Sequence, residues 1–245
     1  MNLVLFSLLL IPFLPLLAFI VQITVGWKLP RQGDWVSTGA IAISFILSAV
    51  ICFSTVFFYH PDVQIHETFR WIELDAINIH LGIFFDPITA IMLFVVTGVS
   101  TLIHFYSVGY MEDDPGYYRF FSYLSLFTFS MLGIVLIDSL FGLYIFWELV
   151  GLSSYLLIGF WYEKPSAANA NKKAFLTTRV GDLGMFLGIM TLVWYVLEFV
   201  PGSSLPVEND PLAFETLFWL NETGAMGTTL MTAVGIMILF GAIGK

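Results

Sequence analysis

The chain has 245 residues, of which 58% are hydrophobic and 11% charged, and its formal net charge is −9. Since a soluble domain is about a quarter charged and about half apolar, this composition excludes an ordinary soluble protein and predicts an integral membrane protein. The single cysteine, Cys52, excludes an internal disulfide and any zinc or iron–sulfur site built on cysteines.

Seven apolar runs are long enough to cross a bilayer as helices, which takes about 20 mostly apolar residues. The runs are continuous, whereas the strands of a barrel would alternate over about ten residues, so we predict an all-α polytopic protein. The first run is too long for the apolar part of a signal peptide and has no basic residues before it, so we expect it to be retained. The predicted spans are Leu3–Val25, Val36–Tyr59, Ile88–Val108, Phe120–Ile137, Leu140–Trp161, Ala174–Val200 and Thr228–Ile243.

Two connections carry structural signals. The stretch Gln64–Pro87 alternates apolar and polar residues around Asp75–Ala76, which predicts a small outer β-hairpin. At its end, Asp86 can cap the third span, and Pro87 is tolerated in a first helical turn. Only Asp138–Ser139 separates the fourth and fifth spans, so we expect those helices to be antiparallel neighbours.

These elements divide the chain into three segments. Residues 1–60 hold the first two spans, residues 61–87 form an outer loop with the hairpin, and residues 88–245 hold the remaining five spans. The connection from Pro201 to Glu222 is rich in Pro, Ser and acidic residues, and we expect it to be a solvated loop.

The basic residues predict the orientation in the membrane. Of the nine Lys and Arg residues, Arg70 alone falls on one predicted side, and Lys245 ends the sequence. The seven on the other side are Lys28, Arg31, Arg119, Lys164, Lys172, Lys173 and Arg179. Because short loops rich in Lys and Arg stay in the cytoplasm, we expect the N-terminus to face outward.

Glu148 is a carboxylate in the middle of the fifth predicted span. Eight residues at 1.5 Å each place it about 12 Å into the membrane from Leu140, near the midplane, where a charge costs roughly 2.5–3.5 kcal/mol. Its helix face is otherwise small or polar, and such a face turns toward other helices or a water pocket. We favour an ion- or proton-handling role over a neutral glutamate that joins two helices. The other residues of this face are Tyr144, Gly151, Tyr155 and Gly159.

The sixth predicted span also carries charges. Arg179 and Asp182 are three residues apart, so they share a helix face and can pair, and an ion pair at the membrane interface would explain them without a transport role. Gly181, Gly184 and Gly188 form a stripe of small residues that predicts close contact with another span.

Lys245 and His104 allow two interpretations each. In a straight helix from Thr228, Lys245 would be a flanking lysine at the inner end, but glycine-interrupted spans are where transporters build their sites. The absence of a polar tail after Lys245 favours a fragment of a longer protein. His104 is the one histidine inside a predicted span; we expect a hydrogen-bonded packing residue, with a proton relay as the alternative.

Three blocks of the sequence resemble the largest antiporter-like membrane subunit of respiratory complex I, the proton-translocating NADH:quinone oxidoreductase, called subunit L or chain 5. The resemblance extends over essentially the whole chain. The same domain recurs in Mrp-type sodium/proton antiporters and in ion-coupled inorganic-carbon uptake complexes, which stay open as alternatives, as does a non-transporting scaffold subunit. The blocks are FFDPITAIMLFVVTGVSTLIHFYSVGYM, YYRFFSYLSLFTFSMLGIVLIDSLFGLYIFWELVGLSSYLLIGFWY and KKAFLTTRVGDLG.

The resemblance implies roles for several residues. Glu148 matches the essential glutamate of the family's fifth helix, and Asp182, beside Arg179, matches an acidic position of the sixth. Lys245 matches the lysine of a broken seventh helix, which would place it deeper in the membrane than a straight helix does. A charged Glu148 would favour protonated Lys245, and neutralising or separating the pair would release the proton. Tyr144 and His104 are expected to support this transfer.

The resemblance also implies what binds elsewhere. We expect no metal and no cofactor in this chain, because NADH, FMN, iron–sulfur clusters and quinone would bind other subunits. The expected partners are other membrane subunits of complex I, especially a neighbouring antiporter-like subunit, together with the lipid bilayer and protons, and no nucleic acid. The expected location is the bacterial inner membrane. Since family members continue into a second inverted repeat, the chain is expected to stop inside the seventh helix.

Overall fold

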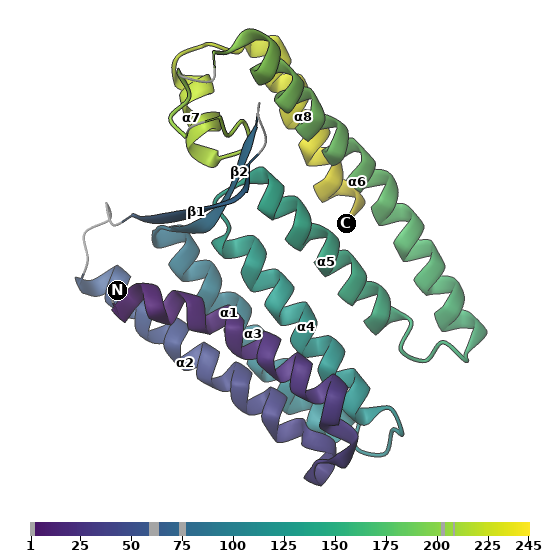
Figure 1. The fold of residues 1–245 in the computed structure, drawn as a ribbon. Coiled ribbons are helices and arrows are strands. Elements are labelled where there is room, and N and C mark those ends of the chain that lie inside the picture. Colours follow the sequence, from purple (N-terminus) through teal and green to yellow (C-terminus); the bar gives the residue numbers. More distant parts are fainter. Residues whose placement is uncertain (1–2, 59–63, 74–76, 202–203, 208) are drawn as a thin grey trace. The chain divides into compact units, whose positions relative to one another are not determined.

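The structure is a computed structural model (Figure 1), and it describes residues 3–58, 64–73, 77–201, 204–207 and 209–245. These residues form helices and a two-stranded sheet. The chain makes two compact units, each described by itself below. Unit 1 comprises Met1–Ile65, Phe84–Leu136 and Leu152–Phe160. Unit 2 comprises His66–Ile83, Ile137–Gly151 and Trp161–Lys245.

The predicted helical membrane architecture is confirmed. Among the described residues, six helices are long and apolar enough to cross a membrane by length and composition. The seventh predicted span corresponds to α8 (Thr228–Gly244), a shorter apolar helix of 17 residues. The six longer segments are Val4–Lys28, Pro30–Val56, Pro87–Tyr110, Tyr117–Leu136, Leu140–Ile158 and Pro165–Phe199.

Unit 1 is built on four helices, in which neighbours in the cyclic order α1, α2, α3 and α4 pack together and α2 also contacts α4. They are α1 (Leu3–Val25), α2 (Asp34–Phe58), α3 (Pro87–Tyr110) and α4 (Tyr117–Leu136). Two short 3₁₀ turns, η1 (Gly26–Lys28) and η2 (Pro30–Gly33), join α1 to α2. The second turn places three consecutive residues in the left-handed region, where the last, Gly33 at φ 76°, meets no steric cost from a side chain.

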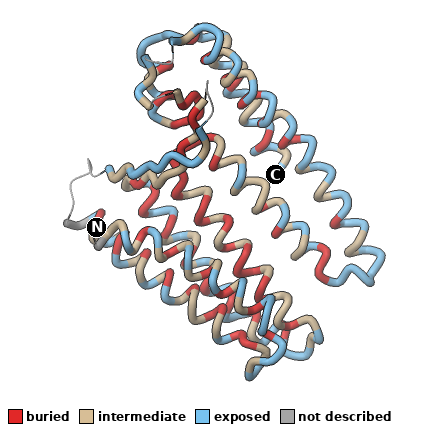
Figure 2. The backbone as a smooth tube through the Cα atoms, viewed as in Figure 1, coloured by how far each residue is buried: buried red, intermediate tan, exposed pale blue. Residues whose placement is uncertain are grey.

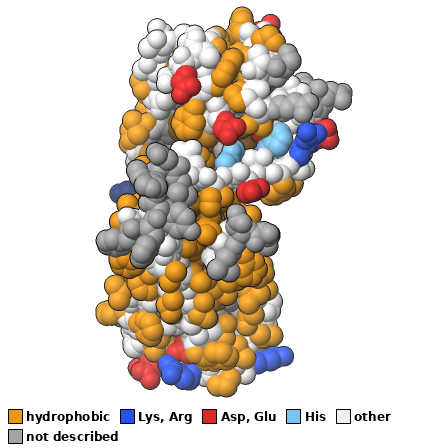
Figure 3. Space-filling model, turned by 90° about the vertical axis from the view of Figure 1, so that its left-hand side faces the viewer, with side chains coloured by type: hydrophobic (Ala, Val, Ile, Leu, Met, Phe, Trp, Pro, Cys, Tyr) orange, Lys and Arg blue, Asp and Glu red, His pale blue; other side chains and the backbone are white. Residues whose placement is uncertain are grey.

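Helix α4 is the most enclosed of the four. Buried residues recur along it at intervals of one to four, and Figure 2 shows this as a nearly continuous red path. The other helices present large apolar side chains outward, such as Phe13, Ile46 and Phe105, each more than half exposed. In the lower part of Figure 3 hydrophobic side chains form a broad orange surface, as expected where lipid replaces water.

The start of α3 follows the sequence prediction. Asp86 has extended backbone angles, and its carboxylate accepts a hydrogen bond from the Thr89 amide at 2.7 Å. Pro87 occupies the first helical position, where its missing amide hydrogen costs no hydrogen bond. The predicted cap is therefore confirmed.

The predicted hairpin is also confirmed, as β1 (Ile65–Glu73) paired with β2 (Asn78–Phe85). Its predicted turn at Asp75–Ala76 lies outside the described residues. In unit 2 the fully buried Asp210 fastens β2 to the segment before α7. Its carboxylate accepts hydrogen bonds from the backbone amide and Nδ1 of His80, at 2.9 and 3.0 Å.

The prediction of a solvated loop between Pro201 and Glu222 is wrong. The segment contains the helix α7 (Phe214–Glu222), and Leu212, Ala213 and Leu220 are buried. Asp210 organises this turn as well, since its other carboxylate oxygen accepts from the amides of Leu212 and Ala213 at 2.9 and 3.1 Å. Acidic composition predicted solvent exposure here, but Asp210 instead satisfies buried backbone amides.

Close packing of α6 (Pro165–Phe199) against α8 confirms the glycine stripe. A methyl group built on Gly181 would lie 2.8 Å from the Cα atom of Gly244, and one built on Gly184 would lie 2.8 Å from the Cβ atom of Phe240. The two helices can approach this closely only because these positions have no side chain. Figure 1 shows α6 in green beside α8 in yellow.

Asp138, which lies between α4 and α5 (Leu140–Ile158), offers a test by pH. It is buried, accepts from the Gly82 amide at 2.8 Å and contacts His66 Nε2 at 3.1 Å. Burial raises the pKa of Asp138 above its ordinary value of 3.8, although His66 opposes the change. The folded chain thus binds this proton more tightly than the unfolded chain, so the free energy of unfolding should rise as pH falls through the raised pKa toward 3.8.

In Asp138→Asn this contribution should vanish, because the amide does not titrate but its oxygen can still accept from Gly82. Thermal unfolding in detergent across the acidic range checks the expectation. Equal pH slopes for the two proteins would contradict it.

Candidate functional site

Glu148 lies on the part of α5 that belongs to unit 2, and its ionic partner comes from α6. The Nη1 atom of Arg179 pairs with the Oε2 atom of Glu148. The same nitrogen is 4.0 Å from Oδ2 of Asp182, so the Arg179–Asp182 contact predicted from spacing is present at the limit of an ion pair. One guanidinium group therefore serves two carboxylates on facing helices.

Two aromatic residues of α5 interact with these carboxylates. The indole Nε1–H of Trp147 donates to Oδ1 of Asp182 at 2.8 Å, and Asp182 is almost fully buried. The hydroxyl of Tyr144, one helical turn before Glu148, donates to its carboxylate. The Tyr144 ring also packs against Phe186 of α6, with 6.0 Å between ring centres.

Lys245 follows α8 directly and reaches α5. Its ammonium group donates to the backbone carbonyl of Trp147 at 2.5 Å and lies 4.9 Å from the centre of the Trp147 ring, within cation–π range. A methyl group on Gly151 would lie 3.2 Å from the Lys245 nitrogen, so the missing side chain at Gly151 makes room for the ammonium group. Helix α8 is continuous as far as Gly244.

The cluster is balanced in charge. Two carboxylates, Glu148 and Asp182, face two cations, Arg179 and Lys245, and both carboxylates act electrostatically on Lys245. A charge in a membrane-spanning helix is tolerated when it is paired in this way. One oxygen of Glu148, Oε1, is buried and accepts no hydrogen bond within the described chain, so it is available to a further proton donor.

Five of the six residues singled out from the sequence thus lie together in unit 2, namely Glu148, Lys245, Asp182, Arg179 and Tyr144. The sixth, His104, lies on α3 in unit 1, where Nδ1 bonds to the Ser100 carbonyl at 2.8 Å. Within the described ranges, no group of three or more His, Cys, Asp or Glu side chains is arranged to hold a metal ion.

Sequence reasoning missed two features of this cluster. It did not assign a role to Trp147, which contacts both Asp182 and Lys245. It also paired Glu148 with Lys245 and left out Arg179, its direct partner. The available signal was that an acidic and a basic residue inside spans usually pair with each other.

Two family models match the chain, and together they cover more than half of it. Residues 71–121 match the model described as NADH-ubiquinone oxidoreductase (complex I), chain 5 N-terminus. Residues 138–245 match the model described as NADH:quinone oxidoreductase/Mrp antiporter, transmembrane region. The second match contains the whole charge cluster.

Curated relatives support the same assignment. The chain is 44% identical over 205 residues to the chloroplast NAD(P)H-quinone oxidoreductase subunit 5 of Mesostigma viride, covering 84% of this chain and 30% of the relative. It is 41% identical over 244 residues to the F420H2 dehydrogenase subunit L of Methanosarcina mazei, covering 96% of this chain and 35% of the relative. The chain thus spans about a third of the length of these relatives.

Solved structures share the fold. A chain of the membrane-bound sulfane sulfur reductase, an archaeal respiratory membrane complex, matches with a TM-score of 0.74 and 16% identity, covering 96% of this chain and 43% of that one. A chain of the Mrp complex from Dietzia sp. DQ12-45-1b matches with a TM-score of 0.71 and 19% identity, covering 99% and 24%.

Proposed function

We propose that this chain, which belongs to the family of antiporter-like membrane subunits shared by NADH:quinone oxidoreductases and Mrp antiporters, moves protons across a membrane as part of a multi-subunit complex. The observation that carries the proposal is the charge cluster formed by Glu148, Arg179, Asp182 and Lys245. Paired, partly buried charges inside spans are expensive and are typical of ion and proton pathways.

The proposed mechanism uses the position of Arg179 between two carboxylates. While Arg179 pairs with Glu148, the negative charge of Glu148 is compensated and acts weakly on Lys245. A shift of the guanidinium group away from both carboxylates, the second of which is 4.0 Å away, would expose their charges and favour the protonated form of Lys245. Return of Arg179 to Glu148 would favour release of the proton from the Lys245 ammonium group.

The surroundings of the chain belong to the proposal as well. The chain would act as a subunit of an oxidoreductase complex in which NADH, FMN, iron–sulfur clusters and quinone bind other subunits. Its partners would be other membrane subunits, including a neighbouring antiporter-like subunit. The proposed location is the bacterial inner membrane. The N-terminus would lie outside, because seven of the nine Lys and Arg residues fall on the opposite predicted side.

The test removes the amine. Lys245→Ala in the full-length subunit, assembled in its complex, should reduce proton translocation by roughly a hundredfold, the scale of a lost acid–base group. Proton uptake driven by electron input is measured in membrane vesicles alongside the rate of electron transfer. The matched control is Lys172→Ala, since Lys172 is an exposed lysine of α6 outside the cluster.

Translocation at the control rate in Lys245→Ala would reject the proposal. A second arm replaces sodium with choline, because the family model that matches residues 138–245 also describes Mrp antiporters. Transport that requires sodium would favour sodium/proton antiport over proton pumping.

A further inference from the structure

Unit 1 contains a buried imidazole whose two nitrogens differ. His104 is fully buried, and its Nδ1 atom bonds to the carbonyl oxygen of Ser100 at 2.8 Å. Because a carbonyl only accepts, Nδ1 must carry the hydrogen, which leaves Nε2 as the acceptor of the neutral ring. Nε2 is buried and has no hydrogen-bond partner among the described residues. Such atoms in native proteins are satisfied by protein groups or by ordered water.

Four hydroxyl groups of the bundle are also buried and have no hydrogen-bond partner in the part of the chain that the structure describes. They belong to Ser37 and Thr38 on α2 and to Ser122 and Ser125 on α4. Other hydroxyls of the bundle bond to their own helix instead. Thr97 donates to the Leu93 carbonyl at 2.7 Å, and Ser130 donates to the Leu126 carbonyl at 2.7 Å.

The contacts between α2 and α3 place Ser37 and Thr38 beside His104. A methyl group on Gly98 would lie 3.0 Å from the Phe45 ring, and Thr101 donates to the Ile41 carbonyl at 3.4 Å. The numbers rise along α3 as they fall along α2, so the helices are antiparallel. One further turn along α3 reaches His104, and one further turn back along α2 reaches residues 37 and 38.

The contacts between α3 and α4 place Ser125 at the same level. The hydroxyls of Ser100 and Thr128 are 2.6 Å apart, and the ring centres of His104 and Phe121 are 6.0 Å apart. Ser125 lies between Thr128 and Phe121 on the same face of α4, at spacings of three and four residues. Ser122 follows one turn from Ser125 on that helix.

A pocket reaches this group from the end of the bundle that holds Arg31. It has a volume of about 370 Å³, and both Asp34 and Thr38 line it. Asp34 is buried and accepts from the Tyr117 hydroxyl at 2.9 Å and from Arg31 at 2.7 Å. Polar groups therefore continue from the pocket at Asp34 to Thr38, one helical turn further along α2.

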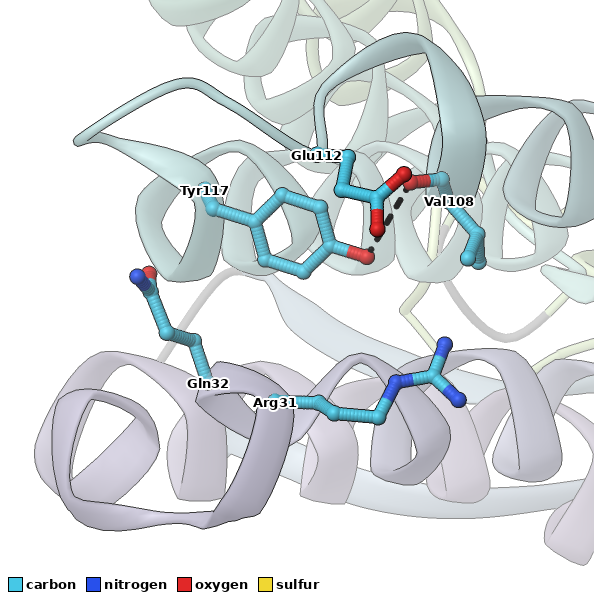
Figure 4. Close-up of a pocket in the computed structure, with 5 residues that line it drawn as sticks. All are labelled: Arg31, Gln32, Val108, Glu112 and Tyr117. Atoms are coloured by element: carbon cyan, nitrogen blue, oxygen red, sulfur yellow. Dashed lines mark hydrogen bonds between the residues drawn. The ribbon is translucent and has the colours of Figure 1, made fainter.

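A second pocket, of about 470 Å³, adjoins the first because both are lined by Arg31 and Val108. Figure 4 shows Glu112 and Tyr117 directed toward the Val108 carbonyl, with Arg31 and Gln32 on the opposite wall. This end of unit 1 is thus open and polar, whereas the middle of α1, α2 and α3 presents apolar side chains outward.

We propose that unit 1 holds a hydrated proton-uptake site in which Nε2 of His104 is the acceptor, connected to the pocket at Asp34 by water bound to the Ser37, Thr38, Ser122 and Ser125 hydroxyls. On uptake, an O–H bond of a protonated water breaks and an N–H bond forms at Nε2, so the imidazole becomes an imidazolium ion and neutral water remains. The reverse step returns the proton.

Helix α1 carries no ionisable side chain from Leu3 to Val25. The ionisable groups of the packed helices at this end are Asp34, Tyr106, Tyr110, Tyr117, Tyr118, Arg119 and Tyr123.

The hydration can be tested without any activity. A cryo-EM map of the intact complex that resolves ordered water should show density within hydrogen-bond distance of Nε2 and of the Ser125 hydroxyl. A map in which Nε2 is surrounded only by carbon atoms, with no water density, would overturn the proposal.

The transfer role rests on the proposed function, and a serine variant tests it. The double variant Ser122→Ala, Ser125→Ala removes one oxygen atom from each side chain, which is a small change, so it should still assemble. Because it removes two hydroxyls that are proposed to bind the connecting water, it should lower proton translocation by about tenfold. Ser130→Ala is the matched control, since Ser130 is buried on the same helix and bonds only to its own helix carbonyl. His104→Gln should lower translocation at least as far, and if it fails to assemble the serine pair decides.

The two proposals fail differently. Equal translocation in the double variant and in Ser130→Ala overturns the role of His104, while loss of transport in Lys245→Ala would still support the proposed function. Normal transport in Lys245→Ala rejects that function, whereas water at Nε2 would still support the hydrated site.

Discussion

Glu148→Gln is expected to reduce proton translocation by roughly a hundredfold while the subunit still assembles in its complex. Glutamine keeps the shape of the side chain and can still accept a hydrogen bond from Tyr144, but it has no negative charge. Arg179 would then have Asp182, at 4.0 Å, as its remaining carboxylate, which limits the loss of stability. Without the charge at position 148, α5 would contribute no carboxylate to Lys245, and Asp182 of α6 would be the remaining one that acts on it.

The measurement is proton translocation in vesicles, with the amount of assembled complex determined on native gels. Glu163→Gln is the matched control, because Glu163 is an exposed glutamate in the connection that follows α5. Assembled complex with an unchanged rate would reject the relay and favour a scaffold subunit, in which the charges only join helices.

Gly181→Ala is expected to prevent most assembly, although it adds a single methyl group. That methyl group would lie 2.8 Å from both the Cα atom of Gly244 and the carbonyl oxygen of Phe240. These are backbone atoms of α8, so they cannot move aside as a side chain can, and overpacking of this kind typically costs about 1–3 kcal/mol or more. Displacing α8 would also draw Lys245 away from the Trp147 carbonyl.

The matched control is Gly235→Ala, on α8 itself, where a methyl group meets no atom of the described residues within 4 Å. This change should be neutral or stabilise the helix by up to about 1 kcal/mol, because alanine favours helix more than glycine does. The yield of complex after detergent extraction and its thermal midpoint separate the two variants. Similar values for both would show that α6 and α8 do not depend on this close approach.

The sequence predicted those parts of the fold that depend on local signals. Asp86 and Pro87 form a helix start within four residues, and the stripe of Gly181, Gly184 and Gly188 marks a packing face within one helix. The first signal lies at one helix end, and the second recurs at the spacing of residues on one helix face. Hydropathy found the membrane part of α6 but not its first turns, because the 35-residue helix is about 52 Å long and extends beyond an apolar layer of about 30 Å.

The remaining features depend on contacts between distant parts of the chain. Arg179 pairs with Glu148 across 31 residues, and no local pattern indicates which of two nearby carboxylates it prefers. The same holds for Asp210, whose acidic character predicted a solvated loop. Its amide donors from Leu212 and Ala213 are local, but its amide and imidazole donors from His80 are 130 residues away. Charged residues make spans recognisable, but their partners are set by how the helices pack.

The bond between His80 and Asp210 has a consequence for biosynthesis. The two residues are 130 positions apart, and α5 and α6 are translated between them. The ribosome must therefore complete both of these helices before β2 can acquire its buried carboxylate. The attachment of β2 to the segment before α7 is therefore a late step of folding. In nascent chains that end before Asp210 the hairpin would lack this attachment and would be exposed to quality-control proteases.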